Sequence, residues 1–513
     1  MNPVDIKRSI QWNTVLLVAV SVLNLATNIF LVRTLSIGEY AVYIILISFK
    51  NTIAGMSDFG VSTSYTKYFH QIAHDYGISS SMLFTYHVLV IKVTILLVII
   101  ALIYVFNGIV LSYFKLDAVF IFNIALILII IIVDSIANVF ERYFEVNLKQ
   151  KLLNIVKTVV SVLFVVSVYS FYWLDKIDAK NVLYSLLLVS CLKIIILAYY
   201  FYIENRCFYN KNTYRWLSES NIPRFIKNSV NIYLDKISTT LISTSFLIII
   251  ITPFFSKNDI AFLSLACDFV SKTLAFMLFP VNGLILPVFA HTYAYKQHDG
   301  LSDIYHRTVK YCGLLFAIMA GFIMINSQYI ITILYTSRYA ASIIYVNLLV
   351  PMLFAEQVVV LSTVPVFYVR ETYKMYWINR AFIIFWVACF TLSVMQIKLS
   401  ILSVLILYGL IKLLNIVSLS YYSHTINKMA LPWRLYAKIL FSICLSVTVA
   451  MASGGILYTS PLLLRSIVVT IVYGIALFVT IRVLNIFDYT DIELADKLKI
   501  PGLRVLFKGN NNP

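Results

Sequence analysis

The chain has 513 residues, of which 61% are hydrophobic and only 12% charged, and its mean hydropathy is +0.89. A water-soluble enzyme or binding domain of this composition could not hide its apolar surface, so the composition favours a membrane protein. The net charge of +17 could indicate a nucleic-acid partner. However, the basic residues fall between apolar runs rather than in one stripe, so no nucleic-acid partner is expected.

Fourteen apolar runs are long enough to cross a bilayer, which takes about 20 residues per helix. In chain order they are predicted at 12–31, 41–63, 84–106, 118–140, 153–172, 182–203, 229–252, 260–283, 307–327, 342–365, 375–396, 399–421, 436–457 and 462–485. The predicted fold class is therefore an all-α integral membrane protein of about fourteen transmembrane helices. The loops between these runs are short, so no soluble domain is expected.

The positions of Lys and Arg orient these predicted spans. With the N-terminus in the cytoplasm, 26 of the 40 basic residues fall on the cytoplasmic side, eight in outside loops and six within spans. Cytoplasmic loops of membrane proteins carry an excess of Lys and Arg, so both termini are predicted to be cytoplasmic. The basic tail at 486–513 either contacts anionic lipid or is a solvated tail.

Six lysines lie inside the apolar runs: Lys50, Lys92, Lys193, Lys236, Lys272 and Lys412. A charge at the centre of a transmembrane helix costs about 2.5–3.5 kcal/mol, so such residues usually face a protein interior or a wet cavity. Together they indicate a transporter with a cationic pathway.

A weak internal repeat links the second and eighth spans. Residues 38–41 (GEYA) open the second span, and residues 258–261 (NDIA) open the eighth, 220 residues later. Lys50 and Lys272 then fall at similar depths. An even number of spans between the copies would give parallel repeats. Chance similarity between two loop-to-helix junctions is the alternative.

The first two spans carry a recognisable pattern. Residues 31–41 (LVRTLSIGEYA), followed by 57–60 (SDFG), resemble the N-terminal signature of polysaccharide-unit flippases of the multidrug/oligosaccharidyl-lipid/polysaccharide exporter superfamily. Ala41 stands where the family usually has glycine. The signature residues, expected to be structural, are Arg33, Glu39, Tyr40, Asp58 and Gly60. Residues 334–339 resemble a second family loop without its usual glycine.

The resemblance implies two six-helix lobes around a central cavity. The expected lobes are 1–205 and 206–430, followed by two helices at 431–485 and a cytoplasmic tail at 486–513. The implied activity is flipping of an undecaprenyl-diphosphate-linked oligosaccharide across the bacterial cytoplasmic membrane by alternating access, for O-antigen, capsule or exopolysaccharide. Partners expected besides this glycan are membrane lipids, a polysaccharide polymerase and a chain-length regulator. No motif identifies the sugar.

A diphosphate crossing a region of low dielectric requires cationic side chains. Because the resemblance implies that spans two, seven and eight line the cavity, Lys50, Lys236 and Lys272 are predicted to bind substrate. An internal ion pair is the alternative, and Asp268, four residues before Lys272, makes it serious there. Asp235 is a poorer partner for Lys236, since adjacent helix residues do not face each other. The other three lysines are expected to be structural or to snorkel.

Buried carboxylates in transporters can carry coupling protons or bind sodium. The candidates for ion coupling are Asp235, Asp268 and Glu356, with charge balance for nearby lysines as the alternative. Asp58 is instead expected to hold helix packing.

No cofactor, metal site or catalytic residue is expected. The six cysteines form no CxxC motif, and we find neither a nucleophile–base arrangement nor a Gly-rich phosphate loop. The alternative function is a cation-coupled small-molecule or drug exporter of the same superfamily. Such exporters usually have twelve spans and acidic, aromatic cavities, which fits this chain less well.

Overall fold

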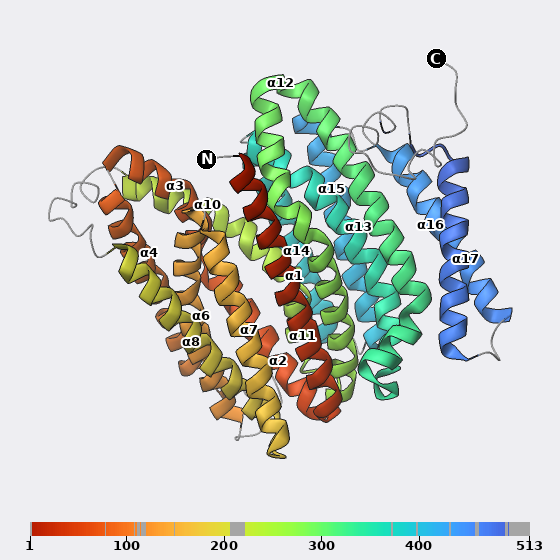
Figure 1. Cartoon of the computed structure of the whole chain (residues 1–513), viewed down its shortest axis with the longest axis horizontal. Helices are drawn as coiled ribbons and strands as arrows, with labels where there is room; N and C mark the ends of the chain where they lie inside the picture. The colour runs from red at the N-terminus through yellow and green to blue at the C-terminus, as the bar shows by residue number, and fades with distance from the viewer. Residues whose placement is uncertain are drawn as a thin grey trace. The chain divides into compact units, whose positions relative to one another are not determined.

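In the computed structural model, every element among the described residues is a helix (Figure 1). The structure describes residues 3–76, 78–106, 108–109, 113, 120–147, 149–205, 221–370, 373–396, 399–429, 432–456, 461–487 and 491. The helices are α1 (Pro3–Thr34), α2 (Ile37–Ser57), α3 (Val61–Tyr76), α4 (Ile78–Val105), α6 (Phe120–Val146), α7 (Gln150–Trp173), α8 (Ala179–Asn205), α10 (Asn221–Leu241), α11 (Thr244–Ile251), α12 (Lys257–Tyr335), η1 (Ser337–Tyr339), α13 (Ser342–Val369), α14 (Tyr373–Gln396), α15 (Ile401–Asn427), α16 (Trp433–Ile456) and α17 (Leu462–Val483).

Eleven segments within the described residues are long and apolar enough to cross a membrane. Two of them, Lys257–Met277 and Gly300–Tyr335, belong to the single long helix α12, whose ribbon folds over between them (Figure 1). Shorter apolar stretches at Val18–Thr34 and Ile383–Val394 correspond to the first and eleventh predicted spans. The predicted all-helical membrane fold is confirmed.

The seventh predicted span, 229–252, differs from expectation because it is two helices. The polar helix α10 ends at Leu241, and the apolar helix α11 begins after Ser243. Ser243 has an extended backbone, and its hydroxyl accepts a hydrogen bond of 3.3 Å from the backbone N–H of Phe246. A serine in this position is a preferred N-cap, so the sequence itself restarts the helix here.

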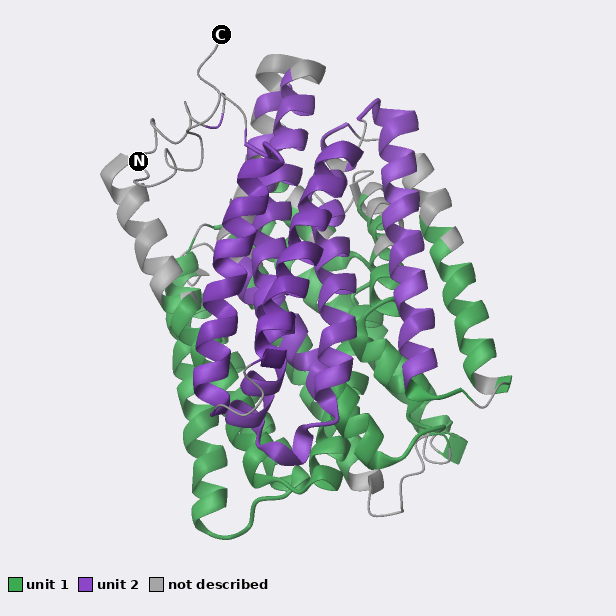
Figure 2. Ribbon diagram, turned by 90° about the vertical axis from the view of Figure 1, so that its right-hand side faces the viewer, with its two compact units in different colours: residues 1–264, 380–401 green, residues 265–379, 402–513 purple. Residues whose placement is uncertain are grey.

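The chain divides into two compact units, coloured separately in Figure 2. Unit 1 comprises residues 1–264 and 380–401, and unit 2 comprises residues 265–379 and 402–513. These limits do not follow the predicted division at residue 206, and the two six-helix lobes stay a prediction. The predicted tail at 486–513 lies outside the described residues, apart from 486, 487 and 491.

Helix α6 forms the centre of unit 1, where it packs against α2, α3, α4, α7 and α8. Its apolar run buries Ile127, Ile130 and Ile131 completely. Helix α4 is much less buried than α6, because Val90, Leu97 and other apolar side chains on it are more than half exposed. Apolar side chains exposed along a spanning helix are the ones that would face lipid.

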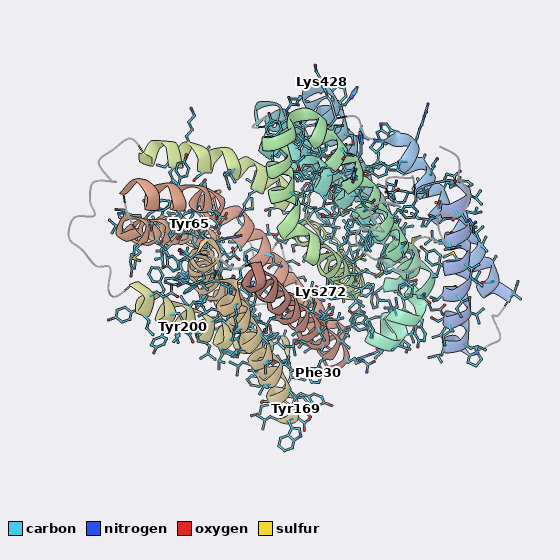
Figure 3. The ribbon with its side chains drawn as sticks, turned by 45° about the horizontal axis from the view of Figure 1, so that its top comes forward. Phe30, Tyr65, Tyr169, Tyr200, Lys272 and Lys428 are labelled. Carbon is cyan, nitrogen blue, oxygen red and sulfur yellow. The ribbon has the colours of Figure 1, made fainter. Side chains whose placement is uncertain are left out.

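Aromatic side chains gather where α1 and α7 meet in unit 1. Phe30 of α1 packs edge-on against Tyr172 and tilted against Tyr169, both on α7 (Figure 3). The neighbouring Trp173 is 80% exposed. Exposed Tyr and Trp are typical of membrane–water interfaces, so a bilayer boundary is expected at this end of α7.

In unit 2, the second half of α12 packs against α16 and α17 through a common apolar cluster. Tyr473 of α17 donates a hydrogen bond of 3.1 Å to the carbonyl of Ile318. A Cβ at Gly321 would lie 2.1 Å from the Tyr473 hydroxyl, so glycine is required for this close approach. The contact fixes α17 on α12.

Candidate functional site

The Asp-Phe-Gly segment of the sequence signature forms a sharp turn between α2 and α3. Phe59 and Gly60 both have positive φ angles, 45° and 69°. A Cβ at Gly60 would lie 2.3 Å from the carbonyl oxygen of Ser229 on α10. Glycine is therefore required twice, by the left-handed backbone and by the approach of α10. Phe59 stacks on Tyr233 of α10, with ring centroids 4.2 Å apart.

Asp58, at the start of this turn, is the centre of a charged cluster in unit 1. One carboxylate oxygen lies 3.1 Å from Lys92 Nζ of α4, and the other accepts a 2.5 Å hydrogen bond from Lys236 of α10. The Ser62 hydroxyl of α3 also donates to Asp58 and accepts a 3.0 Å bond from Lys92. One carboxylate thus joins four helices.

Lys50, the first predicted substrate ligand, forms an ion pair across unit 1. Its Nζ lies 2.8 Å from Asp134 on α6. The Ser190 hydroxyl of α8 donates a 2.8 Å bond to the other oxygen of the same carboxylate. Lys50 therefore ties α2 to α6, and through Asp134 to α8.

Lys193 of α8 pairs with Glu141 of α6, and Lys157 of α7 lies 3.1 Å from the same carboxylate. Glu141 was missed by sequence reasoning, because it lies just beyond the predicted end of its span. Two lysines again share one carboxylate, as they do at Asp58.

The remaining two intramembrane lysines belong to unit 2. Lys272, labelled in Figure 3, bonds Asp268 of its own helix α12 at 2.8 Å, which is the pair that the i,i+4 spacing indicated. Lys412 of α15 lies 2.7 Å from Glu356 of α13, and Asn415 donates a 2.7 Å bond to the other oxygen of Glu356. The second pair is buried on both sides and links two helices.

Each of the six intramembrane lysines therefore has a carboxylate partner in this structure. The exposed fraction of the side chain separates them. It is 34% for Lys236 and 35% for Lys272, but only 6% for Lys92 and 7% for Lys412. Lys50 is intermediate at 17%. Lys193 is also intermediate at 19%, so Lys236 and Lys272 are the two most exposed of the six lysines.

The sequence profile of a family described as polysaccharide biosynthesis protein matches residues 6–293, more than half of the chain. The chain belongs to the polysaccharide biosynthesis protein family. The resemblance seen in residues 31–41 and 57–60 predicted this correctly. A search of curated proteins found no significant match.

Solved structures share the fold of this polysaccharide biosynthesis protein at low sequence identity. The lipid II flippase MurJ, in an inward closed conformation, aligns with a TM-score of 0.67 and 15% identity over 92% of this chain and 99% of its own. An inward-facing multidrug resistance MATE family transporter of the MOP superfamily gives 0.57 and 14% over 80% and 95%. A MOP superfamily transporter from Pyrococcus furiosus, described as having a binding pocket of reversed polarity, gives 0.57 and 13% over 82% and 96%.

The other signature residues of the family lie around the start of α2. Glu39 accepts a 2.9 Å hydrogen bond from the backbone N–H of Ala179, the first residue of α8. Its own backbone N–H donates to the Ser36 hydroxyl at 3.2 Å, which caps α2. Tyr40 is completely buried, and Arg33 is exposed in the last turn of α1. Glu39 thus satisfies a backbone donor at the start of a second helix.

Of the predicted coupling residues, Asp268 and Glu356 are the partners of Lys272 and Lys412. Asp235 lies on α10, but its side chain is outside the described residues. Lys236 bonds Asp58.

Proposed function

We propose that this protein flips an undecaprenyl-diphosphate-linked oligosaccharide across the bacterial cytoplasmic membrane by alternating access, with both termini in the cytoplasm. Membership of the polysaccharide biosynthesis protein family and the fold likeness to a lipid II flippase support the proposal. The product would serve O-antigen, capsule or exopolysaccharide assembly, with a polymerase and a chain-length regulator as later partners.

The observation that carries this proposal is the excess of cations among the intramembrane ion pairs. Lys92 and Lys236 share the single carboxylate of Asp58, so this cluster keeps one net positive charge when all three groups are ionised. Buried charge is retained in membrane proteins mainly where function needs it. A surplus cation within apolar helices favours an anionic cargo, and a diphosphate is such a cargo.

We propose that the substrate binds when Lys236 and Lys272 exchange their carboxylate partners for its diphosphate. Lys272 is bonded to a carboxylate of its own helix, so releasing it separates no helices. Lys236 can leave Asp58 while Lys92 still neutralises that carboxylate. Diphosphate oxygens would replace the carboxylate oxygens and form charge-assisted hydrogen bonds of similar geometry. Lys50 is proposed as a weaker third ligand, because its pair with Asp134 joins α2 to α6 and is less exposed.

In alternating access, the cavity between the lobes, proposed at 1–205 and 206–430, opens first to one side of the membrane and then to the other. This motion requires helices that can bend. The interruption between α10 and α11 lies a few residues beyond Lys236. Discontinuous helices are typical of transporter binding sites. We therefore place the bending point next to this cation.

Ion coupling is proposed at Asp268, which is 24% exposed next to Lys272. Protonation of Asp268 would release Lys272 for the diphosphate, so proton and substrate binding would be linked. Glu356 is a weaker candidate, because Lys412 and Asn415 occupy both of its oxygens. Asp235 stays a candidate from its position on α10 alone.

The alternative proposal, a cation-coupled drug exporter, draws on the fold likeness to MATE transporters. A cationic drug would need an unneutralised carboxylate. Among the described carboxylates within the spans, Asp58, Asp134, Asp268 and Glu356 all pair with lysine. The charge balance therefore favours the anionic cargo.

The proposal is tested in a polysaccharide-producing cell that depends on this protein. Lys236→Ala and Lys272→Ala should each abolish surface polysaccharide and accumulate the lipid-linked repeat unit in the cytoplasmic leaflet. Lys227→Ala and Lys257→Ala, on the same two helices, are the matched controls and should act like wild type. Normal surface polysaccharide in both test variants, at normal protein level, would overturn the proposal. Drug resistance that depends on the protein would support the exporter instead.

A further inference from the structure

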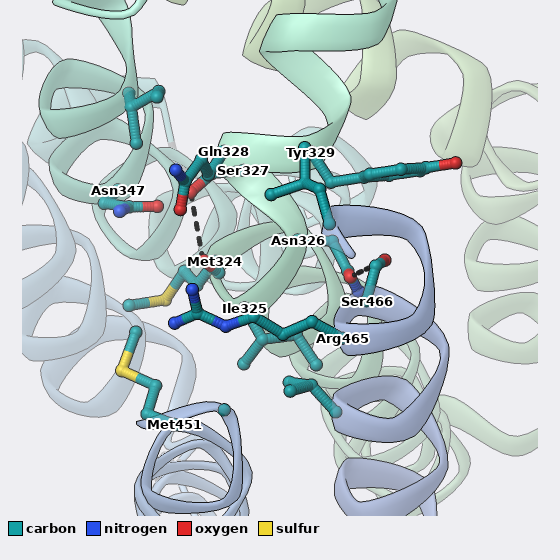
Figure 4. A pocket seen from close by; sticks show the side chains of 14 residues that line it. Met324, Ile325, Asn326, Ser327, Gln328, Tyr329, Asn347, Met451, Arg465 and Ser466 are labelled. Carbon is teal, nitrogen blue, oxygen red and sulfur yellow. Dashed lines mark hydrogen bonds between the residues drawn. The ribbon is translucent and has the colours of Figure 1, made fainter. Parts of the chain in front are cut away.

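Unit 2 contains a pocket that the proposed flipping pathway does not use. It has a volume of about 340 Å³ and lies among α12, α13, α16 and α17 (Figure 4). The lining comes from the ends of these helices near the α12–α13 and α16–α17 connections. In the predicted orientation this end of unit 2 faces the outside, at the depth of the outer headgroups.

The walls of the pocket combine polar and apolar side chains. The polar lining residues are Asn326, Ser327, Gln328, Asn347, Arg465 and Ser466. Arg465 reaches from α17 toward the middle of the pocket, and no carboxylate occurs among the described lining residues (Figure 4). The guanidinium rests against α16 where Gly454 leaves room, since a Cβ there would lie 3.5 Å from Arg465 Nε. The charge of the pocket suits an anion.

One wall of the pocket is built rigidly. Asn326 is 2% exposed, accepts a 2.6 Å bond from the Ser466 hydroxyl and donates a 2.9 Å bond to the Thr470 hydroxyl. These bonds join α12 to α17 directly behind the pocket. The position of Arg465, one residue before Ser466, is thereby fixed relative to α12.

The opposite wall carries an acceptor that lacks a donor. Asn347 Oδ1 of α13 is buried and has no hydrogen-bond partner among the described residues. A buried carbonyl oxygen without a partner costs about 1–3 kcal/mol. A ligand that combines an anionic group for Arg465 with a hydroxyl for Asn347 would remove this cost.

The pocket adjoins a lipid-facing surface. Leu463, Leu464 and Ile467 of α17 are each about half exposed, at 56%, 49% and 50%. Met324 and Met451 contribute apolar surface within the pocket itself. An amphiphile could therefore place its headgroup in the pocket and its chains along α17.

We propose that this pocket binds the headgroup of an anionic phospholipid, with the phosphate on Arg465 and a headgroup hydroxyl donating to Asn347. The proposal does not depend on the cargo of the flippase. Phosphatidylglycerol has both groups, phosphatidic acid has only the phosphate, and phosphatidylcholine has neither a net charge nor a hydroxyl.

Native mass spectrometry of the full detergent-purified chain with these three lipids tests the proposal. Wild type should retain phosphatidylglycerol best. Arg465→Met should retain it about tenfold less, and Arg465→Lys should lie between. Arg482→Met, at the exposed other end of α17, is the matched control and should equal wild type. Asn347→Leu should weaken retention of phosphatidylglycerol but not of phosphatidic acid.

Two results would overturn the proposal. The first is equal retention of phosphatidylglycerol by wild type, Arg465→Met and Asn347→Leu. The second is displacement of the lipid by glycerol 1-phosphate or inorganic phosphate at equal concentration, which would make the site one for a free anion. If Arg465→Met does not fold, as judged from its melting temperature, the Asn347→Leu comparison decides alone.

Discussion

The helices α2 and α12 begin alike and use their lysines differently. Each starts after a serine whose hydroxyl accepts a 3.2 Å bond from the backbone N–H three residues later, Ser36 for α2 and Ser256 for α12. Lys50 of α2 bonds a carboxylate on another helix, whereas Lys272 bonds one on its own. The first cation holds the bundle together, and the second is free to change partner without opening it.

The ends of these segments differ as well. Helix α2 stops at Asp58 in a left-handed turn against α10, whereas α12 continues as one helix beyond the corresponding position. The two helices therefore begin in the same way, but α2 is followed by a tight turn packed against α10, whereas α12 is not interrupted at the corresponding position. From this contrast we expect α2 to contribute more to stability and α12 more to the proposed substrate binding.

Gly60→Ala changes the tight turn that follows α2 and should have the largest effect. The added Cβ would meet the carbonyl of Ser229 at 2.3 Å, and alanine disfavours the φ of 69°. We expect a loss of more than about 3 kcal/mol in unfolding free energy. Thermal unfolding of the purified protein measures it. Gly38→Ala, where no atom lies within 4 Å of the new Cβ, is the control. Equal melting temperatures would disprove the constraint.

Lys50→Ala tests the cross-helix pair and should have the next largest effect. It leaves the partly buried Asp134 without its cation, which should cost about 2–3 kcal/mol. The double variant Lys50→Met/Asp134→Asn should recover most of this loss. Lys272→Ala should cost about 0.5 kcal/mol, the value for an i,i+4 pair, because this pair lies within one helix and its loss separates no helices. Equal losses of unfolding free energy for Lys50→Ala and Lys272→Ala would show that the two ion pairs do not differ in their contribution to stability.

The smallest effects are expected for the serine N-caps that α2 and α12 have in common. Ser36→Ala and Ser256→Ala each remove one helix cap, which should cost about 1 kcal/mol in both cases. The comparison uses unfolding midpoints measured side by side. A cost confined to one of the two would show that the helix openings are not equivalent.

The sequence predicted the apolar helices well, because spans of about 20 apolar residues leave little choice of structure. It also offered the Lys272–Asp268 pair, whose members lie one turn apart, as the alternative to substrate binding by Lys272. It could not predict that Lys50 meets Asp134 or that Lys236 meets Asp58, because those partners are brought together only by helix packing. Glu141 was missed because it lies one residue beyond the predicted end of its span, 118–140. The interruption at Ser243 has a local signal in the sequence, a serine directly before an apolar run. A prediction from hydropathy alone does not use this signal.

The central claim is that Lys272 exchanges Asp268 for a substrate diphosphate. The most direct measurement is the affinity of the purified protein for farnesyl diphosphate by calorimetry, with Lys257→Ala as the control on the same helix. Lys272→Ala should bind about tenfold more weakly, as expected for the loss of one charge-assisted hydrogen bond of about 1.5 kcal/mol. Its melting temperature should be unchanged. Wild-type affinity in Lys272→Ala would contradict the account.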